Sequence, residues 1–147
     1  MAQTRINNAK AIQNCDNIVD ELDTIGGSLE FYDNTQPSNV DDAAGATPIV
    51  NISLPANVFQ PAVDGNPGGQ ATADPANLPL SALAVVSGGG STVLTWFRVK
   101  NSGGTAIWDG DVSAGGGGGD IELDSTTITD GQQLNVNTWM FTAPEIC

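Results

Sequence analysis

The chain contains no histidine and only four cationic side chains among its 147 residues. Without histidine it lacks the commonest general base, the commonest metal ligand and the usual pH switch near neutrality. Against four Lys and Arg stand 17 Asp and Glu, so the formal net charge is -13 at pH 7. Nucleic acids and anionic membranes both require clustered positive charge, so this balance argues against either as a partner.

Cysteine and long apolar runs are also scarce. The two cysteines, Cys15 and Cys147, form no CxxC pair, so a zinc or thioredoxin-like site is not predicted. A Cys15–Cys147 disulfide and two free thiols both remain open. No apolar run approaches the roughly 18 residues of a transmembrane helix, and no apolar segment of a signal peptide follows Met1. We therefore expect a protein made in a cytoplasm, and used or assembled there.

One segment, residues 4–23, has the periodicity of a helix. Its apolar residues recur in steps of three and four, which places them on one helical face: Ile6, Ala9, Ile12, Cys15, Val19 and Leu22. Thr4 is the predicted N-cap, and Gly26 with Gly27 ends the helix. This stripe is expected to cover the sheet of its own subunit, with docking on a neighbour as the alternative.

After Gly27 the apolar period becomes two, which indicates strands. Short strands are predicted at residues 28–33, 48–54, 70–73, 80–86, 120–123 and 126–129, and a last strand at 132–142. Within that last strand the apolar phase shifts by one residue near Asn137 and Thr138, which predicts a β-bulge. The five glycines at 115–119 predict a flexible tip or a close-approach loop.

The clearest hairpin joins residues 92–100 to residues 105–109. Its turn is Asn101-Ser102-Gly103-Gly104. The alternation predicts that Phe97 and Val99 face the core with Trp108 opposite one of them. Trp96 then lies on the other face, an unusual place for tryptophan unless another layer covers it.

These elements predict a mainly β protein: an antiparallel β-sandwich or jelly-roll-like domain preceded by one N-terminal α-helix. The domain organisation is an N-terminal helix or arm at 1–27 and a β-sandwich at 28–147, one domain overall. A chain of this length buries enough surface for such a core without disulfides.

No catalytic, cofactor or metal site is predicted. Acidic pairs that a glycosidase could use are Asp109 with Asp111 and Asp120 with Glu122, but such pairs on turns are usually solvated. Calcium ligands could come from the same acidic stretch together with Asp124 and Asp130, or from the pair Asp41-Asp42. Neither group has the spacing of an EF-hand, so turns without an ion are the better interpretation. The glycine-rich segments lack the Lys-Ser/Thr of a phosphate loop.

The four cations form two local positive spots in an acidic chain. Arg5 and Lys10 make one, and Arg98 and Lys100 make the other. Trp96 stands beside Arg98, and aromatic residues and arginine are enriched at protein interfaces. The candidate interface residues are therefore Arg5, Lys10, Trp96, Arg98 and Lys100. The alternative places Trp96 over its own sheet beside the Arg98 stem.

Six short segments carry a resemblance to a known family: TRINNA (4–9), NIVD (17–20), YDNTQP (32–37), TWFR (95–98), AIWDGDV (106–112) and WMFTAP (139–144). They resemble segments of a family of small structural proteins of tailed-bacteriophage virions. The resemblance implies a non-enzymatic decoration or cement protein on the capsid surface, assembled in the host cytoplasm. Its partners would be the major capsid protein and further copies of itself in a trimer. The glycine run at 115–119 is not a feature of that family.

Two other functions are compatible with the composition. A tail or neck component of the same particle would share every compositional feature. A carbohydrate-binding β-sandwich would instead use exposed aromatic rings, with Tyr32 and Trp96 as stacking platforms.

Overall fold

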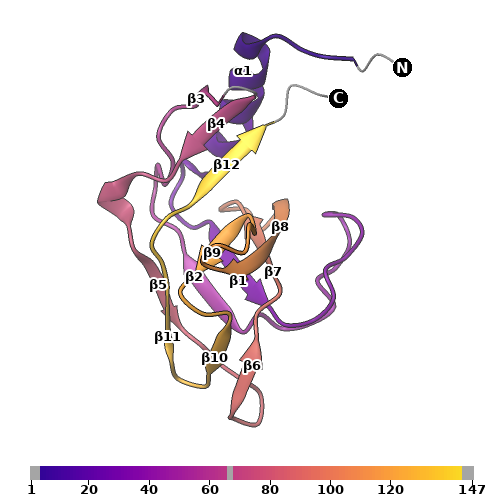
Figure 1. Ribbon diagram of the computed structural model, residues 1–147, viewed down its shortest axis with the longest axis vertical. Coiled ribbons are helices and arrows are strands. Elements are labelled where there is room, and N and C mark those ends of the chain that lie inside the picture. The colour runs from indigo at the N-terminus through magenta and orange to yellow at the C-terminus, as the bar shows by residue number, and fades with distance from the viewer. Residues whose placement is uncertain (1–3, 66–67, 144–147) are drawn as a thin grey trace.

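The computed structural model describes residues 4–65 and 68–143. Figure 1 shows an elongated molecule with three groups of elements along its long axis. One end holds α1 (Asn8–Val19), β3 (Val63–Asp64), β4 (Gly69–Thr72) and β12 (Met140–Ala143). The middle holds β1 (Ser28–Tyr32), β2 (Val50–Ser53), β7 (Trp96–Lys100), β8 (Ala106–Ala114) and β9 (Ile121–Leu123). The other end holds β5 (Leu80–Leu83), β6 (Ser91–Val93), β10 (Thr127–Thr129) and β11 (Gln133–Val136).

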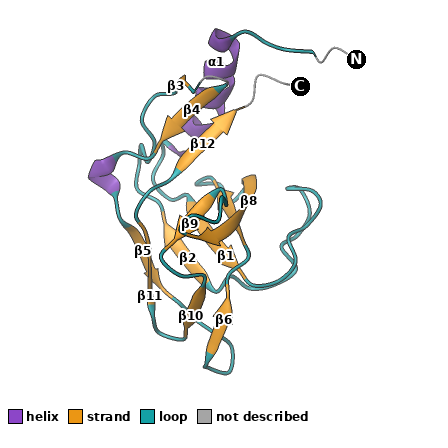
Figure 2. Cartoon of the chain, in the orientation of Figure 1, coloured by secondary structure: helices purple, strands orange, loops and turns teal. Residues whose placement is uncertain are grey.

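Strands dominate the described chain, and α1 is its one α-helix (Figure 2). Two short 3-10 helices, Asp20–Leu22 and Pro75–Asn77, complete the elements. The fold is mainly β and β-sandwich-like, which confirms the predicted class. No described helix has the length and apolar character needed to cross a membrane.

The helix is shorter than predicted. It starts at Asn8 because Asn7 is its N-cap and accepts a hydrogen bond from the backbone N–H of Lys10 at 2.9 Å. Thr4 lies outside it, so the predicted cap was wrong; asparagine caps helices better than threonine. The 3-10 turn Asp20–Leu22 continues the helix, and Gly26 then adopts a φ of 112°, a conformation that glycine favours.

The apolar face of α1 packs on its own subunit, against β4 and β12. Ala11, Cys15 and Val19 of α1 are buried, as is Leu22 in the 3-10 turn, whereas Ala9 is exposed. Gly69 on β4 makes this packing possible, since a Cβ there would lie 2.7 Å from the Cα of Ile12. Cys15 is fully buried, and burial raises the pKa of its thiol. Cys147, the other half of the Cys15–Cys147 disulfide that the sequence left open, lies outside the described residues.

The central sheet has the order β2-β1-β7-β8-β9. Its pairs are antiparallel except that β9 runs parallel to β8. Val99 pairs with Trp108, as the hairpin pattern predicted. The inner face carries Leu29, Phe31, Val50, Ile52, Phe97 and Val99, all at most 1% exposed.

Two predicted strands are each divided between two sheets. Residues 92–100 become β6, which pairs with β10, and β7, which pairs with β1 and β8. Residues 132–142 become β11, which pairs with β5, and β12, which pairs with β4. The predicted bulge at Asn137 and Thr138 was therefore wrong, because the phase shift there marks a chain that leaves one sheet for another.

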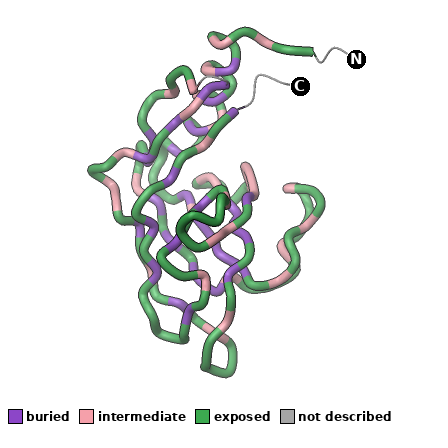
Figure 3. Tube along the Cα trace, in the orientation of Figure 1, coloured by how far each residue is buried: buried purple, intermediate pink, exposed green. Residues whose placement is uncertain are grey.

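One hydrophobic core joins the three groups. Buried residues run from α1 through the central sheet to β5 and β11 (Figure 3). Every buried side-chain N or O atom in the described residues has a hydrogen-bond partner. Because the buried apolar residues form one continuous cluster, the helix and the sheets share one interior.

Candidate functional site

The outward face of the central sheet carries a buried ion pair. Arg98 on β7 lies opposite Asp109 on β8, and its Nε and Nη2 donate to the two carboxylate oxygens at 2.7 and 2.8 Å. The two side chains are 4% and 2% exposed. Such bidentate geometry is the strong form of an Arg–carboxylate contact. The Asp109 hydrogen bonds raise the pKa of Arg98 further, so this charge is permanent.

An aromatic stack lies beside the ion pair. The rings of Tyr32 and Trp96 are 4.4 Å apart between centroids and nearly parallel, at 12°. The guanidinium of Arg98 lies 5.4 Å from the Trp96 ring centroid, within cation–π range. Trp96 Nε1 donates to Asn34 Oδ1 at 3.1 Å. Trp96 is thus held by the Tyr32 ring, by the Arg98 guanidinium and by a hydrogen bond at its polar tip.

Glu30 completes this network on β1. It accepts hydrogen bonds from Tyr32 Oη at 2.6 Å and from Lys100 Nζ at 3.1 Å. Burial first, and then the hydrogen bond to Glu30, raise the pKa of Tyr32 above its ordinary range. Tyr32 therefore stays a neutral donor at physiological pH.

A long loop closes over this face, and we call residues 33–48 the cover loop. It leaves β1 and returns to β2, and it forms the lobe beside the central sheet in Figure 1. Arg98 Nη1 donates to the Asp42 carbonyl at 2.7 Å, and Asn34 Nδ2 donates to the Ala44 carbonyl at 2.8 Å. This loop supplies the further layer that a tryptophan at position 96 required.

The structure separates the five candidate interface residues into two groups. Trp96 and Arg98 are 1% and 4% exposed, so no partner can reach them while the cover loop is closed. Lys100 forms an ion pair with Glu30. Arg5, just before α1, and Lys10, in the first turn of α1, are exposed at the far end, and Lys10 Nζ donates to Gln13 Oε1 at 3.0 Å.

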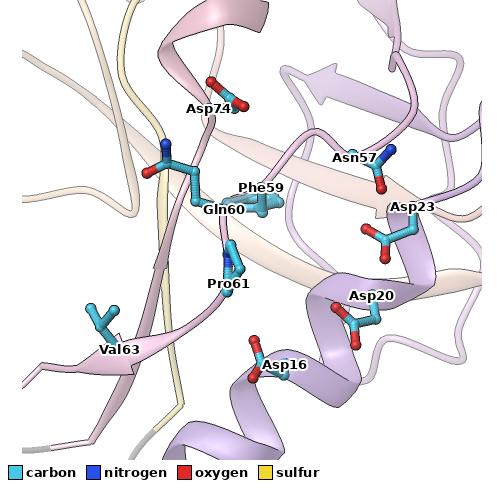
Figure 4. A pocket seen from close by; sticks show the side chains of 9 residues that line it. All are labelled: Asp16, Asp20, Asp23, Asn57, Phe59, Gln60, Pro61, Val63 and Asp74. Atoms are coloured by element: carbon cyan, nitrogen blue, oxygen red, sulfur yellow. The ribbon is translucent and has the colours of Figure 1, made fainter.

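An acidic groove lies between α1, with the turn that follows it, and the facing segment 57–63. The strand and helix patterns did not predict it. Its volume is ≈ 770 Å³, and its walls include Asp16, Asp20, Asp23 and Asp74 (Figure 4). Asp16 Oδ1 accepts from the Ala62 backbone N–H at 2.7 Å. Burial raises the pKa of Asp20, and the neighbouring Asp23 and Asp16 raise it further.

The acidic pairs considered for catalysis or metal binding are engaged within the fold. Asp109 binds Arg98. Asp111 and Asp120 exchange hydrogen bonds, each carboxylate accepting from the other's backbone N–H at 3.0 and 3.2 Å. Among residues 4–65 and 68–143, no group of three or more Asp, Glu, Cys or His side chains could hold a metal ion.

The glycine run 115–119 forms a close-approach loop around one carboxylate. Glu122 on β9 accepts from the backbone N–H of Gly116 at 3.1 Å and of Gly118 at 3.0 Å. Both glycines have positive φ, of 84° and 79°. The two hydrogen bonds lower the pKa of Glu122, since they favour its charged form.

Acid should release this loop at a pH below the usual pKa of glutamate. The pKa of Glu122 is lower in the folded chain than in the unfolded chain. The ionised carboxylate therefore stabilises the fold fully at a pH above its unfolded pKa, and this stabilisation disappears as the pH falls through its folded pKa. In an NMR titration the amide signals of Gly116 and Gly118 should shift together, with a midpoint below 4.5, the ordinary glutamate value.

Two substitutions test the assignment. Glu122→Gln should abolish the titration of both amides, and Asp124→Asn, at an exposed neighbour, should leave it intact. A midpoint at or above the ordinary value would contradict the prediction.

Comparison with known proteins gave no match. No protein-family model, no curated protein sequence and no solved structure is significantly similar to this chain.

Proposed function

We propose that this protein is a non-enzymatic structural subunit that binds other protein subunits, with decoration of a phage capsid shell as its setting. The observation that carries the proposal is the distribution of positive charge. Two of the four cations are paired with carboxylates of their own chain, the buried Arg98 with Asp109 and the partly exposed Lys100 with Glu30. Arg5 and Lys10 remain exposed at one end of a molecule of net charge -13.

This distribution gives the molecule a polarity. A partner with an acidic surface is attracted to the end near Arg5 and Lys10, while the remaining surface repels other copies and limits nonspecific association. The residues proposed to contact the shell are therefore Arg5 and Lys10. The segment that bears them lies at the tip of the molecule (Figure 1).

The buried network on the outward sheet face supports the same function. Arg98 donates to Asp109 and to the Asp42 carbonyl of the cover loop, and Tyr32 donates to Glu30 beside them, in hydrogen bonds of 2.6–2.8 Å. A fully satisfied polar network makes a domain rigid. A rigid module that binds only one state of a shell stabilises that state by mass action.

The carbohydrate-binding alternative loses the residues on which it was based. Tyr32 and Trp96 are both 1% exposed, and they stack on each other. Neither ring can stack on a sugar in this arrangement.

Co-sedimentation with shells assembled from the major capsid protein of the same genome tests the proposal. Arg5→Gln combined with Lys10→Gln should weaken binding by about two- to thirtyfold, as expected for the loss of two exposed ion pairs. The expected cause is the loss of attraction to an acidic shell surface.

The matched control is Ser87→Glu combined with Gln132→Glu. Both residues are exposed, they flank β5 and β11 at the opposite end, and the double substitution changes the net charge by the same amount. The control should bind as the wild type does. Equal weakening by both variants, or no binding by the wild type, would overturn the proposal.

A further inference from the structure

A small pocket with aromatic walls lies between β8 and β12, on the side of the sheet opposite the cover loop. Its volume is ≈ 310 Å³, and its walls include Phe97, Trp108, Trp139 and Phe141. This volume is at the small end of ligand pockets, which span roughly 300–1,000 Å³. The rings come from three separate segments of the chain, so the pocket exists only in the folded protein.

The aromatic rings are fixed relative to one another. The ring centroids of Trp108 and Phe141 are 4.8 Å apart, and those of Trp108 and Trp139 are 5.8 Å apart. Phe97 and Trp139 meet edge to face at 89°. Trp108 and Phe141 are partly exposed, whereas Phe97 and Trp139 are buried beneath them. The two exposed rings can therefore present surface to a ligand.

A carboxylate stands at the same pocket. A Cβ added to Gly110 would lie 2.5 Å from the Phe97 ring and 2.8 Å from Asp120 Oδ2. The missing side chain of Gly110 thus lets the Asp120 carboxylate approach the aromatic floor. Burial raises the pKa of Asp120, which agrees with this apolar setting.

The chemistry of the walls selects the ligand. Aromatic faces attract cations, and a neighbouring carboxylate adds charge attraction. No Lys or Arg lines the pocket, and both oxygens of Asp109 at its edge are taken by Arg98. A neutral sugar would need several polar side chains that can both donate and accept, and Thr142 is the one lining residue whose side chain can do both.

We propose that this pocket binds an alkylammonium group, placed against Trp108 and Phe141 and beside Asp120. Such a group is carried by a lysine side chain on a partner protein and by small quaternary amines. The net charge of -13 favours the approach of either one. The inference depends on the pocket alone and is independent of any role on a shell.

NMR of the three tryptophan indole N–H groups provides the test. The probes are tetramethylammonium chloride, Nα-acetyl-lysine methylamide and N-acetylglucosamine, each against sodium chloride at equal concentration. Both cations should shift the indole signals of Trp108 and Trp139. The Trp96 signal should not move, because that ring stacks on Tyr32 on the other face of the sheet.

Two variants keep the test decisive. Asp120→Asn should weaken cation binding by about tenfold, while Asp124→Asn, at an exposed residue outside the pocket, should not. Because Asp120 also accepts from the Asp111 N–H, Phe141→Leu is the second variant, and it should weaken both cations by removing one ring.

The relative affinity of the two cations identifies which kind of molecule supplies the alkylammonium group. Tighter binding of the lysine derivative would indicate a partner's side chain, and tighter binding of tetramethylammonium would indicate a free quaternary amine. If N-acetylglucosamine shifted Trp108 as strongly as the cations, or if neither cation shifted it, the proposal would be wrong.

Discussion

Replacing Arg98 with methionine is expected to lower the free energy of unfolding by about 3–5 kcal/mol, the usual result of removing one partner from a buried ion pair. The substitution leaves the Asp109 carboxylate, 2% exposed, without its two charged donors. It also removes the donor to the Asp42 carbonyl, which holds the cover loop. Urea unfolding followed by circular dichroism measures the change.

The double substitution Arg98→Met with Asp109→Leu separates charge burial from packing. Replacement of a whole buried pair by apolar side chains is often neutral or stabilising, so the double variant should recover most of the lost stability. A single variant that loses less than about 1 kcal/mol would resemble an exposed pair and contradict this account.

Gly69→Ala is expected to destabilise the protein by about 3 kcal/mol, the upper part of the range for an overpacked core. The new Cβ would meet the carbonyl oxygen of Ala11, and it would lie 2.6 Å from the Ala11 carbonyl carbon and 2.7 Å from the Cα of Ile12. These are backbone atoms of α1, which cannot rotate away as a side chain can. The helix should therefore lift from β4, and its amide hydrogens should exchange faster.

Gly115→Ala is the control for the general effect of glycine substitution. No atom lies within 4 Å of a Cβ at this position, so the stability should change little. If Gly69→Ala and Gly115→Ala were equally stable in urea, the close approach of α1 to β4 would not determine stability.

The sequence predicted the local elements well where a single period governed them. The alternation in residues 28–33 and 92–109 correctly predicted β1, the inner face of β7 and the Val99–Trp108 pair. That register also places Asp109 opposite Arg98, so the ion pair could have been found from the hairpin alone. The interface hypothesis overlooked it because it treated Arg98 as exposed.

The cover loop, the aromatic pocket and the division of residues 132–142 between two sheets depended on contacts between distant segments. The cover loop has no apolar period, and it is held by the backbone carbonyls of Asp42 and Ala44, which no residue pattern reports. The aromatic pocket needs Trp139 and Phe141 from a strand that changes sheets after β11. The break in residues 132–142 could not be predicted locally, because the choice of sheet is made by remote partners.

The packing of α1 has a consequence for biosynthesis. Cys15 on α1 lies 3.8 Å from the Phe141 carbonyl on β12, 126 positions further along the chain. A ribosome that adds about 5–20 residues per second needs roughly 6–25 s to make those 126 positions. During that interval the apolar side of the nascent helix lacks its β12 partner, so this part of the core can close only after the last strand has been made.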